Sequence, residues 1–321
     1  MKTFDIKSND ANQRLDKFIR KSLPALPQSL MYKYIRKKRI KINGKRAEIS
    51  TVLNVGDKVD MYISDEFFVQ PETKYDFTDA PDKLDIIYED ENILLLDKKA
   101  GILCHPDGKE YVDTLVARVK KYLYKKGEYN PDESSFTPAL VNRIDRNTGG
   151  IVIAAKNADS LRVLNEQMKR RNLKKIYLCV LCGIPEKQEG LLNGFLVKDE
   201  NKNTVRVLKE STDGAKEIKT KYKIISADKE ANLSLAEVEL LTGRTHQIRA
   251  HFASIGCPLL GDGKYGRKKE NEKFGFNKQL LYSYKLVFNL DEDSDLLAYL
   301  TGQSFEVQDV WFKQKFENGI L

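Results

Sequence analysis

Residues 142–157 read NRIDRNTGGIVIAAKN, and the chain's expected chemistry and fold meet in this stretch. A single carboxylate, Asp145, stands between Arg143 and Arg146, and a Thr-Gly-Gly turn then leads into an apolar run. A short apolar run bounded by turn residues predicts a buried strand. Flanking guanidinium groups favour the ionised form of a carboxylate. Asp145 is therefore suited to act as an anion, either a nucleophile or a base, rather than as a general acid.

The same spacing has a plainer interpretation. Arginines on both sides of an aspartate also form surface ion-pair clusters that carry no chemistry. The glycine pair at 149 and 150 favours the functional interpretation, because glycines let a substrate backbone approach closely.

Composition limits the class of protein. The chain has 321 residues, 41% hydrophobic and 32% charged, which predicts about two globular domains. Its apolar runs, such as ILLL at 93–96 and IVIAA at 151–155, are short, whereas a membrane span needs about 20 residues. The first residues, MKTFDIKSND, lack the apolar stretch of a secretory signal, and four cysteines fit a reduced compartment. We expect a cytoplasmic monomer.

The positive charge is concentrated at the N-terminus. Residues 1–66 hold 15 Lys and Arg against 8 Asp and Glu, while the other 255 residues hold 40 against 39. A helix is expected over 14–24, and Ser29 is the expected N-cap of a second helix. Asn43-Gly44 predicts a hairpin turn. The second helix should turn one basic face outward, to track RNA phosphates or only to be solvated, with Lys33, Arg36, Lys37 and Lys38 on it.

The rest of the chain divides into a connection and a larger body. Residues 67–84 are acidic and proline-containing, which predicts a linker or an arm lying across the next domain. From residue 85 to 321, short strands and helices mix without a regular alternation. This pattern predicts an α+β fold with a mixed, largely antiparallel sheet, preceded by the small basic module.

Two further stretches carry candidate functional residues. In KKIYLCVLCG, Tyr177 lies on a strand with almost no polar face, where it either serves a site or is a core tyrosine with a satisfied hydroxyl. In LTGRTHQIRAH, Arg244 lies at a strand-to-helix junction and Arg249 lies about one turn further along.

The histidines and cysteines do not predict a metal site. His246 and His251 are five residues apart, which is not the spacing of a helical metal pair. Cys179 and Cys182 are three apart on a strand, so they point to opposite faces. We expect core cysteines, structural or RNA-facing histidines, and no metal.

Asp145 in NRIDRNTGG, Tyr177 in KKIYLCVLCG and Arg244 in LTGRTHQIRAH occur in the order found in RluA-type pseudouridine synthases, which modify ribosomal large-subunit RNA. The sequence resembles that family over nearly its whole length, with GDGKYG at 261–266 continuing the pattern. Residues 12–63 resemble the α-L RNA-binding fold.

The resemblance implies an RNA uridine isomerase that needs no cofactor. By matching position, Asp145 is the catalytic carboxylate, Tyr177 stacks on the base and removes a ring proton, and Arg244 pairs with Asp145. Arg143 matches the arginine that fills the gap left by the flipped uridine, and Arg146 and Arg249 are expected RNA contacts.

Two positions depart from the family pattern. Asn142 replaces a histidine and Gly149 replaces a serine. These changes keep open a non-catalytic RNA-binding or ribosome-assembly factor on the same fold. A synthase directed at transfer RNA rather than ribosomal RNA is a further alternative.

Overall fold

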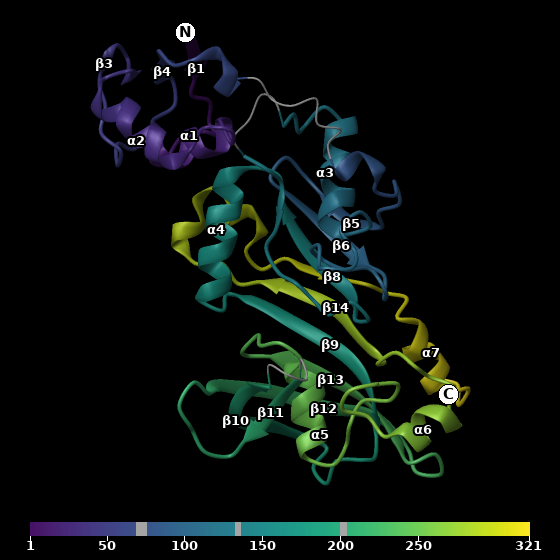
Figure 1. Ribbon diagram of the computed structural model, residues 1–321. Coiled ribbons are helices and arrows are strands. Elements are labelled where there is room, and N and C mark those ends of the chain that lie inside the picture. Colours follow the sequence, from purple (N-terminus) through teal and green to yellow (C-terminus); the bar gives the residue numbers. More distant parts are fainter. Residues whose placement is uncertain (69–75, 132–135, 200–203) are drawn as a thin grey trace.

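The computed structural model describes residues 1–68, 76–131, 136–199 and 204–321. A small N-terminal module lies at one end of an elongated molecule, and one large sheet runs through the body (Figure 1). Within the described ranges, no helix is both long and apolar enough to cross a membrane. The cytoplasmic location stays a prediction.

The N-terminal module packs two helices on a four-stranded antiparallel sheet of strand order β1-β4-β2-β3. Its elements are β1 (Lys2–Asp5), α1 (Leu15–Ser22), α2 (Gln28–Arg36), β2 (Ile40–Ile42), β3 (Lys45–Arg46) and β4 (Lys58–Met61). The apolar stripe of α1 is buried in this module's own core, as predicted, with Leu15, Phe18, Ile19 and Leu23.

The start of α2 differs from the prediction. Its N-cap is Pro27 rather than Ser29, and the Pro27 carbonyl accepts the first helical hydrogen bond from Met31 N at 2.9 Å. Proline lacks an N–H but keeps its carbonyl, so it begins a helix without losing a bond. The predicted turn at Asn43-Gly44 is confirmed, with φ values of 50° and 72°.

The body contains a sheet of eleven strands among the described residues. Nine of them follow the order β11-β10-β12-β13-β9-β14-β8-β6-β5, while β15 pairs with β14 and β7 with β8. Every pairing is antiparallel except β14 with β8. The predicted α+β class with a mixed, largely antiparallel sheet is confirmed. The strands are β5 (Ile86–Glu89), β6 (Ile93–Lys98), β7 (Ala139–Leu140), β8 (Gly149–Ala155), β9 (Leu173–Cys182), β10 (Glu189–Asp199), β11 (Thr204–Leu208), β12 (Lys216–Asp228), β13 (Leu233–Leu240), β14 (Leu281–Phe288) and β15 (Ser304–Glu306).

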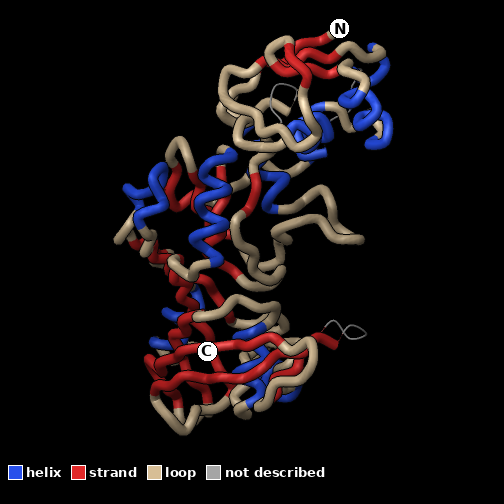
Figure 2. Tube along the Cα trace, turned by 90° about the vertical axis from the view of Figure 1, so that its left-hand side faces the viewer, coloured by secondary structure: helices blue, strands red, loops and turns tan. Residues whose placement is uncertain are grey.

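Helices cover both faces of this sheet, because successive strand residues point to opposite sides. One face packs against α3 (Leu115–Lys125) and α5 (Gln247–Ser254). The other packs against α4 (Ala158–Lys169), the 3-10 segment η3 (Glu292–Leu300) and α7 (Trp311–Glu317). Figure 2, turned by 90°, shows these helices against the strands. The short helix α6 (Lys268–Lys273) lies outside the buried clusters. Cys179 faces the first core and Cys182 the second, as their spacing predicts.

The glycine pair is required by the seam between β8 and β14. These strands run in parallel, with Gly149 opposite Tyr282 and Gly150 opposite Ser283. A Cβ at Gly149 would lie 2.4 Å from the Tyr282 ring, and one at Gly150 would lie 2.2 Å from the Ser283 carbonyl oxygen. Packing against β14 therefore explains both glycines, where the sequence suggested room for a substrate backbone.

The connection between module and body contacts the body after residue 75. Two 3-10 turns, η1 (Asp65–Phe68) and η2 (Asp76–Asp79), flank residues 69–75, which lie outside the described ranges. Phe77 is buried in the core beneath α3, and Asp82 pairs with Lys121 and Lys125 of that helix. The end of this segment is thus an arm across the body. The domain boundaries at 66 and 84 stay a prediction.

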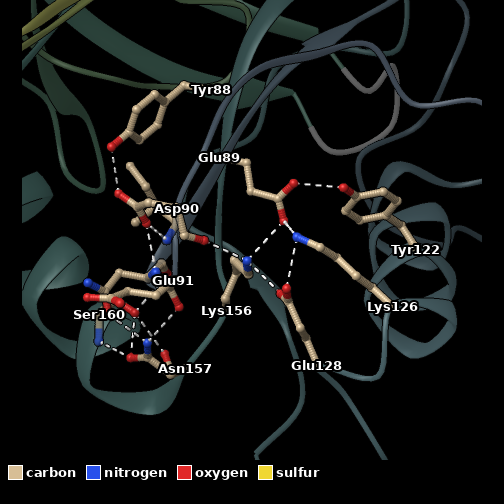
Figure 3. Close-up of polar contacts among 12 residues, drawn as sticks. Tyr88, Glu89, Asp90, Glu91, Tyr122, Lys126, Glu128, Lys156, Asn157 and Ser160 are labelled. Atoms are coloured by element: carbon tan, nitrogen blue, oxygen red, sulfur yellow. Dashed lines mark hydrogen bonds and ion pairs between the residues drawn. The ribbon is translucent and has the colours of Figure 1, made fainter.

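An ion-pair network fixes α3 to the sheet (Figure 3). Lys156, whose side chain is 5% exposed, lies between Glu89 at 2.9 Å and Glu128 at 2.6 Å. Lys126 contacts the same two carboxylates at 2.8 Å each, and the Tyr122 hydroxyl donates to Glu89 at 2.7 Å. The network joins β5, the end of α3 and the residue that follows β8.

We predict that Glu89→Gln reduces stability in a pH-dependent way. Burial alone would raise the pKa of Glu89, but hydrogen bonds from Lys126, Tyr122 and Lys156 lower it to about 2. A lowered folded-state pKa gives stability that is present above about pH 4.5 and is lost as pH falls towards 2. In urea unfolding, the free energy of unfolding of the variant should therefore be lower than that of the wild type at pH 6, and this difference should decrease below pH 4.5.

The exposed Glu186→Gln substitution is the control for this prediction and should leave the urea midpoint unchanged at both pH values. A difference in the free energy of unfolding between wild type and Glu89→Gln that stays constant from pH 6 to pH 3 would contradict the role given to the Glu89 charge.

Candidate active site

A cleft of about 650 Å³ opens on the sheet face that carries α3 and α5. Its walls are the loop before β8, the first half of β9, and the turn between β13 and α5. Asp145, Tyr177 and Arg244 all line it, so the structure brings together three residues that are far apart in the sequence. Arg143 and Arg249 line the same cleft.

Arg249, and not Arg244, pairs with Asp145. Arg249 Nη1 lies 2.8 Å from Asp145 Oδ2, while its Nε and Nη2 donate to the two oxygens of Asp262 at 2.7 and 2.9 Å. Arg244 lies in the exposed turn before α5, and Arg249 is the third residue of that helix. The sequence-based pairing of Arg244 with Asp145 is therefore corrected by the position at which α5 begins.

The predicted role of Arg249 as an RNA contact is corrected as well. Its side chain is only 6% exposed and is held between two carboxylates. Burial alone would lower the pKa of Arg249, but Asp262 and Asp145 raise it above its usual value. Arg249 is thus a fixed cation behind Asp145, with no free face for a phosphate.

Asp262 anchors this arrangement and was not singled out from the sequence. Its side chain is fully buried and also accepts hydrogen bonds from the backbone N–H groups of Lys264 and Tyr265. Burial alone would raise the pKa of Asp262, but Arg249 and these amides lower it. The Gly-Asp pair of GDGKYG was the signal for it, and a buried arginine partner gives that signal a physical reason.

The two arginines beside Asp145 in the sequence do not form a collar around it. Arg146 turns away and donates from Nε to the Gly101 carbonyl at 3.0 Å. Arg143 is exposed at the cleft. The ion pair of Asp145 comes instead from α5, more than one hundred residues later.

His246 also faces Asp145, and its hydrogen bonds indicate which ring nitrogen carries the proton. The residue is at φ 53°, in the left-handed region, and its Nε2 lies 3.8 Å from Asp145 Oδ2. Val205 N donates to the Tyr265 hydroxyl at 2.8 Å, and that hydroxyl lies 3.0 Å from His246 Nδ1. Since the hydroxyl already accepts from Val205, we assign its proton as a donor to Nδ1. The ring proton then sits on Nε2, towards Asp145.

His251 has a structural role. It is buried, and its Nδ1 lies 2.9 Å from the Thr220 hydroxyl. Burial lowers the pKa of both His246 and His251, which favours neutral rings.

Gln247 fixes the turn that presents Arg244 and His246. Its amide oxygen accepts from Thr242 Oγ1 at 2.9 Å and from Arg244 N at 3.1 Å, and its NH₂ donates to Lys219 O and Thr220 Oγ1. A buried amide that uses all its hydrogen-bonding capacity specifies one local conformation.

Tyr177 lies on the cleft wall and is 5% exposed. Burial raises the pKa of Tyr177 to about 12, more than a hydrogen bond with Ser283 lowers it. The side chain is therefore a neutral phenol at neutral pH, which presents a ring and a hydroxyl rather than a standing base.

Lys98 supports the loop that carries Asp145. Its buried ammonium donates to three carbonyls, those of Lys99, Ile102 and Arg146, at 3.1, 2.8 and 3.0 Å. Burial lowers the pKa of Lys98 to about 8. Nothing in the sequence pattern distinguished this lysine from the exposed ones.

Both departures from the family pattern have local partners. Asn142 Oδ1 accepts from Ile153 N at 2.8 Å, and its Nδ2 lies 3.4 Å from Ile151 O, so the side chain pairs with the backbone of β8. Gly149 leaves room for Tyr282. Neither residue contacts Asp145 through these bonds.

No group of three or more His, Cys, Asp or Glu side chains suited to a metal ion occurs in the described part of the chain. All four cysteines are free and buried, as predicted for the core. The expectation that no metal or organic cofactor is used stays a prediction.

Comparisons with known proteins identify the family of this chain. Residues 92–254 match the RNA pseudouridylate synthase family, and residues 13–59 match the S4 domain. An uncharacterized RNA pseudouridine synthase of Mycoplasma genitalium is 34% identical over 89% of this chain and 88% of its own. Ribosomal large subunit pseudouridine synthase C of Rickettsia felis is also 34% identical, over 80% of this chain and 83% of its own.

A solved structure has the same fold. Human RNA pseudouridylate synthase domain containing 4 superposes with a TM-score of 0.55 and 19% identity, covering 70% of this chain and 88% of the human one. The chain belongs to the RNA pseudouridylate synthase family. It is an RNA pseudouridine synthase whose N-terminal module is an S4 domain, as the sequence motifs predicted.

We predict that Tyr265→Phe leaves the protein folded but no longer holds the proton of the His246 ring on Nε2. The ring, 5.2 Å from the Arg249 guanidinium, is retained, while the hydroxyl that holds Nδ1 is lost. Pseudouridine formation should slow roughly tenfold, as expected for loss of about 1.4 kcal/mol from a positioned network. Nitrogen-15 NMR of the imidazole should show the Nδ1–H tautomer gaining population. An unchanged imidazole spectrum would refute the assignment.

Proposed function

We propose that this enzyme isomerises specific uridines of large-subunit ribosomal RNA, with Asp145 as the catalytic carboxylate. The observation that carries the proposal is the Asp145–Arg249 ion pair at the floor of an open cleft lined by Tyr177. The relatives from Rickettsia felis and Vibrio parahaemolyticus are each named ribosomal large subunit pseudouridine synthase C, which supports a ribosomal large-subunit target.

In the proposed reaction Asp145 acts as an anion, either as a nucleophile or by taking a proton from the target nucleotide. The bond between the sugar C1′ and uracil N1 breaks, the uracil turns in the cleft, and C1′ bonds to C5. The proton on C5 leaves and N1 ends with a proton, so substrate and product are isomers. Arg249 places a positive charge 2.8 Å from Asp145 Oδ2 and, being fixed by Asp262, needs no reorganisation during the reaction.

Tyr177, which lines the cleft, is proposed to stack on the uracil. Because its hydroxyl is neutral at pH 7, removal of the C5 proton by Tyr177 requires that its own proton leaves in the same step. Arg143, exposed at the cleft, is proposed to occupy the gap in the RNA after the uridine flips out. Flipping costs a few kcal/mol, which a replacement partner offsets.

Residues 1–66 are proposed to hold the RNA, and residues 85–321 to carry out the reaction, with 67–84 between them. Lys33, Arg36, Lys37 and Lys38 are all exposed on or just after α2, where they are available to phosphates. A non-catalytic RNA-binding factor on the same fold is the alternative, although Asn142 and Gly149, which motivated it, have structural partners. Ribosomal and transfer RNA remain to be separated by experiment.

We predict that Asp145→Asn abolishes isomerisation. RNA carrying tritium on uracil C5 should release it with the wild type and not with the variant, because an amide is neither a nucleophile nor a base. Incubating ribosomal and transfer RNA separately identifies the substrate class, and sequencing of new pseudouridines identifies the position. Undiminished release by Asp145→Asn, or no release by the wild type from any RNA, would contradict the proposal.

We also predict that exchanging Lys33, Arg36, Lys37 and Lys38 for Gln weakens RNA binding and flattens its salt dependence. The log–log slope should fall by about 0.7 to 0.9 for every phosphate that the variant no longer neutralises. The matched control exchanges four exposed lysines on and near β12 for Gln, namely Lys216, Lys221, Lys223 and Lys229. Equal slopes for the two variants would leave the S4 module without the proposed role.

A further inference from the structure

The cleft extends past Tyr177 to a second, cationic end. Lys175 precedes Tyr177 by two residues on β9, and residues two apart on a strand point to the same face, about 7 Å apart. Arg171 and Arg244 line the cleft beside Lys175. This end is separate from the Asp145–Arg249 pair and takes no part in the chemistry described above.

The ammonium of Lys175 has no carboxylate partner among the residues that the structure describes. Its contact is with the thioether of Met168, 3.2 Å away, which is a weak acceptor. Burial lowers the pKa of Lys175, and the neighbouring Arg171 lowers it further. The residue is half-buried, and a partly desolvated charge without a counter-charge costs free energy, so this arrangement reduces the stability of the free protein.

Among the described residues, the three cations that are more deeply buried than Lys175 all have partners. Arg249 lies between two aspartates, Lys156 between two glutamates, and Lys98 among three backbone carbonyls. Lys175 departs from this pattern, and it does so on the wall of the substrate cleft. Functional sites commonly contain residues that lower the stability of the free protein, and ligand binding at the site offsets that loss.

The surroundings of Lys175 leave it open to a ligand. Gly243 lies beside it: a Cβ added there would be 3.8 Å from the ammonium nitrogen, so no side chain intervenes from that position. Arg171 is held at φ 66° after the end of α4, and Arg244 is exposed in the next turn. In the described part of the chain, neither guanidinium forms an ion pair.

We propose that Lys175, together with Arg171 and Arg244, forms a phosphate subsite that binds a backbone phosphate next to the target uridine. Guanidinium forks and an ammonium are the groups that recognise phosphate oxygens in proteins. This inference rests on the proposed RNA substrate, since the subsite continues the cleft in which the base is held. The proposed subsite explains why Lys175, a cation without a carboxylate partner, lies two residues before Tyr177 on the same face of β9.

The test compares Lys175→Met with Lys174→Met. Methionine keeps the apolar stem and removes the charge, and Lys174 is the exposed neighbour on the other face of β9. Equilibrium binding of a ribosomal RNA fragment is measured at several salt concentrations, apart from turnover. Lys175→Met should reduce the log–log salt slope by about 0.7 to 0.9, the equivalent of one phosphate, while Lys174→Met leaves it unchanged.

Thermal unfolding gives the second readout. Lys175→Met should unfold at the same temperature as the wild type or higher, because a charge without a counter-charge is removed from a half-buried position. Uridine and its 3′- and 5′-monophosphates then serve as competitors, and the preference for one monophosphate over uridine should disappear in Lys175→Met. A lower unfolding temperature with an unchanged salt slope would assign Lys175 a structural role and overturn the proposal.

The outcomes separate this inference from the proposed reaction. If the wild type forms no pseudouridine but Lys175→Met still loses one phosphate equivalent, the subsite stands and the reaction falls. If pseudouridine forms and the two variants have equal slopes, the subsite falls and the reaction stands.

Discussion

The site depends on one buried guanidinium. Arg249 joins Asp145, in the loop before β8, to Asp262, in the loop after α5. A buried arginine deprived of either partner would leave an uncompensated charge, which is far more costly than the gain from an exposed pair. The same hydrogen bonds therefore hold the two loops together and keep the anionic oxygen of Asp145 pointed into the cleft. His246 and Tyr265 add a second, neutral support from the turn that α5 and Gln247 define.

The positive charges of this protein have two roles, stabilising the fold and binding RNA, and burial distinguishes them. Buried cations with partners hold the fold, as Lys156 does at α3 and Lys98 does beneath the Asp145 loop. Exposed or unpaired cations lie where an RNA is expected, on the S4 module and along the cleft. The overall charge of +8 does not make this distinction, since it counts both kinds equally. Whether a lysine is buried among partners, either carboxylates or backbone carbonyls, separates the two roles, and only the folded chain gives that information.

The sequence predicted much of the architecture because local patterns determine it. The helix expected over 14–24 and the Asn43-Gly44 turn both follow from nearest neighbours along the chain. The sheet class followed from strand length and spacing. The ordered motifs placed Asp145 and Tyr177 in candidate roles, and the structure finds them on one cleft.

The misassigned features depend on contacts between distant segments. The choice of Arg249 over Arg244 depends on where α5 begins and on a carboxylate at residue 262. Gly149 is explained by Tyr282, a neighbour on another strand, and no pattern near residue 149 indicates it. Lys98 resembles any other lysine in the sequence, and it differs only in what surrounds it. The central claim is tested most directly by single-turnover rates and RNA affinities of Arg249→Lys and Arg244→Lys. For Arg249→Lys we expect a single-turnover rate about 100-fold lower with near-normal RNA affinity, because a small misplacement of a reacting group lowers the rate by about this factor. For Arg244→Lys we expect weaker RNA affinity with a near-normal rate. The reverse pattern would contradict the role assigned to Arg249.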